Sequence, residues 1–232
     1  MIQEILISNI KIWIKKNNKH SKRLIVFIPG VFSDVQKDYF LSLLEIKTGF
    51  DVLIYNLYSQ VNIGNINKSV NDFVLDLENI LNNFKKEYKE IFIIAYSFGS
   101  EVVLRANTLS IVKAVALWSP SFAYPQNITE TLQSHQNNKK VLVYNKTLIG
   151  KKLAKDLDKM DTIKLIPHIC FPVHVYLSCD DYGEKSWANQ EIFKLIPSAK
   201  KNITRLSYKH TYTKKQAGHL YRKTCDWFDK NF

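Results

Sequence analysis

The first third of the chain reads as short runs of apolar residues, which are typical of β-strands. Apolar residues cluster at Ile5–Ile7 and Ile10–Ile14, and Leu24–Ile28 is a continuous apolar run that ends at Pro29 and Gly30. Such a run favours a central strand that is covered on both faces. Similar runs lie further along the chain at Val52–Leu57, Ile91–Ala95, Val112–Trp118, Val173–Ser178 and Ile203–Leu206.

Helical patterns alternate with these predicted strands. From Val70 to Phe84 apolar residues recur at spacings of three and four, which is one stripe of an amphipathic helix, and Ser69 with Asp72 offers a capping box at its start. Shorter helical patterns cover Tyr39–Ile46, Gly99–Asn107, Lys185–Leu195 and Leu220–Phe228. The alternation predicts an α/β fold with a mostly parallel central sheet and helices on both faces.

The segment Ser121–Leu165, after the sixth predicted strand, interrupts this alternation. It is polar, rich in Asn, Gln and Lys, and holds one short strand-like run at Val141–Tyr144. Unpatterned segments of this length are usually lids or binding loops. No internal repeat or Gly/Ser linker marks a second domain. We therefore expect residues 1–232 to form one domain. We expect 121–165 to be a small insertion that lies over the mouth of the functional site.

The sequence Ala95-Tyr96-Ser97-Phe98-Gly99 places a serine in a sharp turn between a predicted buried strand and a predicted helix. Such a turn strains the backbone of the serine and needs small residues two positions before and two positions after it. Ala95 and Gly99 meet that need. A serine that only capped the helix would not require small residues on both sides. The pattern predicts Ser97 as a nucleophile.

A nucleophilic serine needs an orienting acid and a base, and in this context the chain order is serine, acid, histidine. Asp180 and Asp181 follow the strand-like run from Val173, and we expect Asp181 to be the acid, with Asp180 as the alternative. Among six histidines we expect His219 to be the base, in a loop that opens the final helix. His210, just beyond the last predicted strand, is its rival.

An oxyanion hole in this arrangement uses the backbone N–H after the nucleophile and one from the loop after the third strand. These positions predict Phe98 and Val31 as the two donors, since Gly30 lets the chain turn before Val31. In the insertion, four apolar residues could line an acyl pocket or only anchor the insertion to the core. They are Leu142, Tyr144, Leu148 and Ile149.

Taken in order, these motifs resemble the α/β-hydrolase superfamily over Ile5 to Phe232. The resemblance rests on Phe27-Ile28-Pro29-Gly30, Ala95 to Gly99, Leu117-Trp118-Ser119-Pro120, Phe171-Pro172-Val173 before Asp181, and Gly218-His219. Pro29 departs from the histidine usual in the family. The run Lys146–Gly150 resembles the small insertion of feruloyl-esterase-like and acyl-transferase-like members. The resemblance implies cleavage of a carboxylic ester or thioester through an acyl-enzyme, with no metal or organic cofactor.

The net charge of +12 does not indicate a nucleic-acid-binding protein, because Lys outnumbers Arg 29 to 4 and nucleic-acid sites favour Arg with aromatic residues. The charge does motivate an alternative function, an acyltransferase or thioesterase acting on acyl groups of an acidic carrier protein. A further alternative is an inactive pseudo-hydrolase that binds a ligand.

Cys170, Cys179 and Cys225 fit neither a disulfide scaffold nor a zinc-ligand spacing. We expect no signal peptide, because Met1–Ile14 lacks a basic region and a small-residue cleavage site, and no membrane span, because no apolar run reaches about 20 residues. We expect a cytoplasmic protein whose substrate is a small-molecule or carrier-linked acyl ester.

Overall fold

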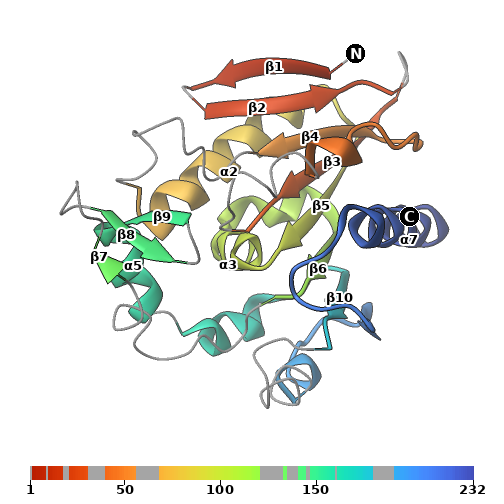
Figure 1. Cartoon of the computed structure of the whole chain (residues 1–232). Helices are drawn as coiled ribbons and strands as arrows, with labels where there is room; N and C mark the ends of the chain where they lie inside the picture. Colours follow the sequence, from red (N-terminus) through yellow and green to blue (C-terminus); the bar gives the residue numbers. More distant parts are fainter. Residues whose placement is uncertain are drawn as a thin grey trace.

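The computed structural model describes residues 2–8, 10–17, 21–30, 40–55, 68–120, 133–134, 141–144, 147–159, 161–179 and 191–232. Its main sheet has eight strands in the order β1-β2-β4-β3-β5-β6-β10-β11 (Figure 1). These strands are β1 (Ile2–Ile7), β2 (Ile10–Lys15), β3 (Arg23–Ile28), β4 (Asp51–Tyr55), β5 (Glu90–Tyr96), β6 (Val112–Trp118), β10 (Val173–Leu177) and β11 (Lys201–Arg205).

Six of these strands run parallel. Only β1 with β2 and β2 with β4 pair antiparallel, while β4, β3, β5, β6, β10 and β11 pair parallel in that order. The predicted α/β class with a mostly parallel sheet is confirmed. Because the strands are parallel, the carboxyl ends of β3, β5, β6 and β10 meet at one edge of the sheet, which is where such sheets place their ligands.

Helices cover both faces of the sheet. They are α2 (Val70–Phe84), α3 (Phe98–Arg105) and α7 (Lys214–Asn231), and a short 3₁₀ helix, η2 (Asn107–Ile111), precedes β6. Residues 40–43 and 191–194 are also helical. No helix in the described part of the chain is both long and apolar enough to cross a membrane.

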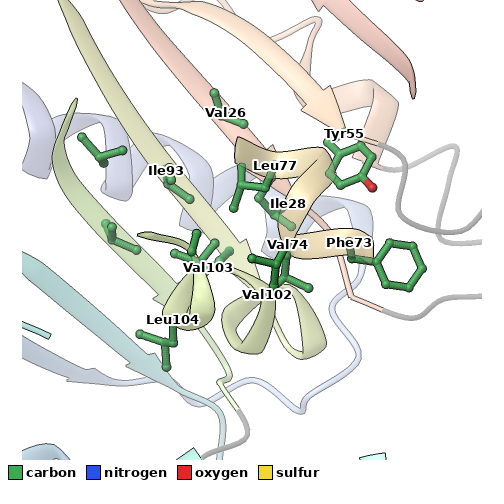
Figure 2. Close-up of a cluster of buried hydrophobic side chains, with 14 of the residues drawn as sticks. Val26, Ile28, Tyr55, Phe73, Val74, Leu77, Ile93, Val102, Val103 and Leu104 are labelled. Carbon is green, nitrogen blue, oxygen red and sulfur yellow. The ribbon is translucent and has the colours of Figure 1, made fainter. Parts of the chain in front are cut away.

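One hydrophobic core lies between the sheet and the pair α2 and α3. Figure 2 shows Val74 of α2 and Val102 of α3 gathered with Val26, Ile28 and Ile93 of the strands. All five side chains belong to one buried cluster. This core fixes α3, and therefore the turn that precedes it, against β3 and β5.

The second core lies on the opposite face, under α7. Tyr221 and Phe228 of α7 are fully buried with Phe27 and Phe92 of the strands. The rings of Phe92 and Phe228 lie 4.7 Å apart. Successive residues of a strand point to opposite faces of the sheet, so Val26 packs in the first core and Phe27 in the second. That is why the central strands are continuous apolar runs rather than alternating ones.

The segment between β6 and β10 contains regular structure of its own. A three-stranded antiparallel sheet is formed by β7 (Gln133–Ser134), β8 (Val141–Tyr144) and β9 (Thr147–Gly150), followed by α5 (Lys151–Asp158) and η3 (Thr162–His168). Asp156 accepts a hydrogen bond from the backbone N–H of Val70 at 3.0 Å, and Lys152 pairs with Asp72 at 2.9 Å. These contacts attach α5 to the start of α2.

A buried histidine lies on β10, away from the carboxyl edge. His174 is 8% exposed, stacks on Tyr176 with ring centroids 4.1 Å apart, and its Nε2 lies 2.9 Å from Thr204 Oγ1. Burial, with a smaller contribution from the charge of Lys223, lowers the pKa of His174 from 6.5 to about 4. Burial therefore disfavours the charged form of this side chain.

We predict that His174 makes the fold less stable as the pH falls. The unfolded chain binds a proton near pH 6.5 and the folded chain only near pH 4, so the free energy of unfolding should fall by about 2 kcal/mol between pH 7 and about pH 5. In urea unfolding, His174→Gln should flatten this dependence, whereas His168→Gln, at an exposed histidine, should retain it. An unchanged slope in His174→Gln would contradict the assignment.

Candidate active site

Ser97 lies in the turn between the end of β5 and the start of α3. Its backbone has φ 51° and ψ −121°, a conformation that L-residues adopt at a cost of about 1–3 kcal/mol. Its N–H donates to the carbonyl of Trp118 on the neighbouring strand at 2.9 Å. The Ser97 side chain makes no capping hydrogen bond to α3. The strained backbone therefore presents a half-buried hydroxyl at the carboxyl edge of the sheet.

Two glycines make room for this turn. A Cβ on Gly99 would lie 2.4 Å from the carbonyl oxygen of Ile28 and 2.8 Å from that of Pro29. A Cβ on Gly30 would lie 2.9 Å from the Cβ of Ser97. The start of α3 thus approaches the end of β3 at a distance that only glycine permits, and Gly30 lies directly beside Ser97.

His210 is the histidine that contacts Ser97. Its Nε2 lies 3.0 Å from Ser97 Oγ, within hydrogen-bond distance, although 113 residues separate the two in sequence. His210 belongs to the loop between β11 and α7 and is half-buried. A neutral imidazole nitrogen at this distance can accept the proton of the Ser97 hydroxyl.

His219, the residue predicted as the base, lies elsewhere. It is an exposed residue inside α7, and its ring contacts Tyr208 at a centroid distance of 6.4 Å. The prediction that it lies in a loop before the final helix is wrong, because α7 begins at Lys214. Thr213 and Gln216 form a capping box there: the Thr213 side chain accepts from Gln216 N and the Gln216 side chain accepts from Thr213 N.

The signal that locates this helix start is present in the sequence. Thr213-Lys214-Lys215-Gln216 has the spacing of a capping box just before the apolar stripe of α7. It moves the start of the helix six residues ahead of the predicted Leu220. His219 then falls on the exposed face, whereas Ala217, Leu220 and Tyr221 face the core.

Of the remaining predicted residues, Phe98 is described and buried. It is the first residue of α3, so its backbone N–H has no acceptor within the helix. Val31, the other predicted donor, lies outside the described residues, as do Asp180 and Asp181. The chain just before this acidic pair is described: Cys179 N donates to the carbonyl of Tyr208, at 2.9 Å, in the loop that carries His210.

The four predicted pocket residues lie in the two longer strands of the insertion. Leu142 pairs with Ile149, Val143 with Leu148, and Tyr144 with Thr147. Their contact with a substrate stays a prediction. Within the described residues, no group of three or more His, Cys, Asp or Glu side chains is arranged to hold a metal ion.

We predict that Gly99→Ala lowers the free energy of unfolding by about 1–3 kcal/mol, because the added methyl would meet two backbone carbonyls rather than a movable side chain. Gly49→Ala is the matched control, since no described atom lies within 4 Å of its added Cβ. Urea unfolding of both variants measures the difference. Equal stability of Gly99→Ala and Gly49→Ala would show that α3 does not depend on this close approach.

No protein-family model matches the sequence, and no curated protein sequence matches it either. Solved structures do match its fold. Est1E from Butyrivibrio proteoclasticus with ferulic acid bound has a TM-score of 0.69 and 12% identity, covering 96% of this chain and 97% of that chain. A soluble variant of monoglyceride lipase from Saccharomyces cerevisiae with a substrate analogue has a TM-score of 0.70 and 12% identity, covering 99% and 94%. DcsB in complex with its substrate analogue has a TM-score of 0.75 and 14% identity, covering all of both chains. The sheet order, the strained serine turn and these matches agree: this chain has the α/β-hydrolase fold.

Proposed function

We propose that this protein is a serine hydrolase that cleaves a carboxylic ester or a thioester through a covalent acyl-enzyme. The observation that carries the proposal is the 3.0 Å contact between His210 Nε2 and the hydroxyl of Ser97, a serine held in a strained turn. Nucleophile and base within hydrogen-bond reach are the signature of an activated serine. The strain of the turn presents that serine at the ligand-binding edge of the sheet.

In the proposed reaction Ser97 Oγ attacks the carbonyl carbon of the substrate while His210 Nε2 accepts the hydroxyl proton. The tetrahedral intermediate carries a negative oxygen, to which the Phe98 N–H can donate, with Val31 as the predicted second donor. Collapse breaks the bond to the leaving group, which takes the proton from His210. Water, deprotonated by His210, then attacks the acyl-enzyme and releases the acid and the free Ser97 hydroxyl.

The acid partner of this base comes from the segment after β10. We retain Asp181, with Asp180 as the alternative, because both follow directly on Cys179, whose backbone is bonded to the loop that carries His210. A carboxylate beside the imidazole would hold its tautomer and stabilise the imidazolium that forms when Ser97 loses its proton.

The choice of an ester over other acyl compounds is supported by the similar structures. Their names include an esterase domain from a Rhodothermus marinus protein and a monoglyceride lipase. Fold alone does not specify a substrate, so the leaving group is part of the test. Hydrolysis should be measured over a panel of ester chain lengths that also includes carrier-linked thioesters.

We predict that a fluorophosphonate probe labels Ser97 covalently and that Ser97→Ala is not labelled. His210→Ala should reduce ester hydrolysis by about a thousandfold or more, because the serine then lacks its base. His219→Ala, nine residues away, should hydrolyse esters like the unmodified protein, because its side chain is exposed on α7. Intact-protein mass spectrometry and initial rates provide both measurements. Labelling of Ser97→Ala, or loss of turnover in His219→Ala alone, would refute the assignment.

The two acidic candidates can be separated in the same assay. We predict that Asp181→Asn lowers kcat by about 10⁴-fold, since an amide at the orienting position favours the wrong imidazole tautomer. Asp180→Asn serves as the matched control and should retain most of the activity. The reverse result would assign the acid to Asp180, and full activity in both variants would place it outside this pair.

A further inference from the structure

The position of His210 depends on a loop rather than on a helix or strand. The loop runs from Leu206 to Thr213, between β11 and α7. A base carried by a loop can react only while its nitrogen stays within hydrogen-bond reach of the nucleophile. Displacements of about 1 Å at a reacting centre can lower rates by about a hundredfold. The contacts that hold the main chain of His210 are therefore important for the proposed function.

Tyr96 makes one of these contacts. It is the last residue of β5, immediately before Ser97, and it is buried. Its hydroxyl donates a 2.7 Å hydrogen bond to the backbone carbonyl of His210, and its ring lies 5.5 Å from the imidazole. Because Tyr96 and Ser97 are consecutive, this bond joins the base to the same strand that carries the nucleophile.

The ring of Tyr96 is itself held in place. Phe40 lies against it at 5.5 Å and Tyr212 at 5.4 Å, measured between ring centroids. Tyr212, two residues after His210, is anchored in turn: its hydroxyl lies 2.5 Å from Ser119 Oγ and 3.2 Å from Ser178 Oγ. These two serines directly follow β6 and β10, so the loop is tied to three strands of the sheet.

We infer that Tyr96 is a positioning residue: its hydroxyl holds the main chain of His210 so that Nε2 stays against Ser97 Oγ. The inference deepens the proposed function and rests on it. In this role Tyr96 acts through His210. Loss of its hydroxyl should therefore slow the reaction of Ser97 without changing the chemistry.

A matched control exists at the opposite edge of the sheet. Tyr88 is also buried, and its hydroxyl donates a 2.8 Å hydrogen bond to Asp51, at the amino end of β4. Tyr88→Phe removes the same atom from an equally buried tyrosine. It separates a general loss of stability from an effect on the geometry of the site.

The test measures the second-order rate constant of fluorophosphonate labelling at Ser97. Tyr96→Phe should lower this rate constant by about three- to tenfold, which is the effect of one hydrogen bond. Tyr88→Phe should leave the rate constant unchanged, even if its melting temperature falls further than that of Tyr96→Phe. In a His210→Ala background, adding Tyr96→Phe should not change the labelling rate constant further, because the imidazole that Tyr96 positions is absent.

A second readout does not depend on reactivity. In ¹⁵N-edited NMR spectra, Tyr96→Phe should shift or broaden the imidazole signals of His210, whereas Tyr88→Phe should leave them in place. Wild-type labelling rates and unchanged His210 signals in Tyr96→Phe would overturn the inference while the proposed function stands. Equal rate losses in both tyrosine variants would also overturn it. Failure of the unmodified protein to label at Ser97 would overturn the proposed function and, with it, the role of Tyr96.

Discussion

The close approach of α3 to β3 is the constraint on which the rest of the site depends. The backbone at Gly99 passes the carbonyls of Ile28 and Pro29 with no space for a side chain. Between the end of β5 and this contact lies only the turn at Ser97 and Phe98, and Ser97 adopts φ 51° there. A strained turn of this kind persists only where the surrounding structure holds it. The turn is followed directly by the first residue of α3, Phe98, whose N–H has no acceptor within the helix.

The two hydrophobic cores supply the support that this turn needs. On one face Val102 and Val103 anchor α3 to the strands, so the helix cannot move away to relieve the strain at Ser97. On the other face Tyr221 and Phe228 anchor α7. Burial of apolar side chains of this size contributes about 1.5–3 kcal/mol each, against about 1–3 kcal/mol for one strained residue. The turn at Ser97 is therefore supported by packing on both sides of the sheet.

The loop that carries His210 is fixed by hydrogen bonds to the ends of strands. Leu206 N donates to the Leu177 carbonyl at 2.7 Å, where the loop leaves β11, and Tyr96 bonds the carbonyl of His210 itself. Loops at functional sites are usually among the more mobile parts of a protein. Here the loop is bonded at several points to the edge of the sheet that bears Ser97, which explains how His210, near the end of the chain, meets Ser97, in its middle.

Local patterns in the sequence determined the strands, the class of sheet and the turn at Ser97, because each depends on residues adjacent in the chain. The eight apolar runs are strands, and the small residues around Ser97 mark the turn. The start of α7 was also encoded locally, in Thr213 and Gln216, although the apolar stripe alone placed it too late. Local patterns did not identify the histidine that contacts Ser97. His210 and His219 both follow the last strand, and only the path of the loop and the rotation of α7, which long-range packing sets, brought the first to Ser97 and turned the second to the surface.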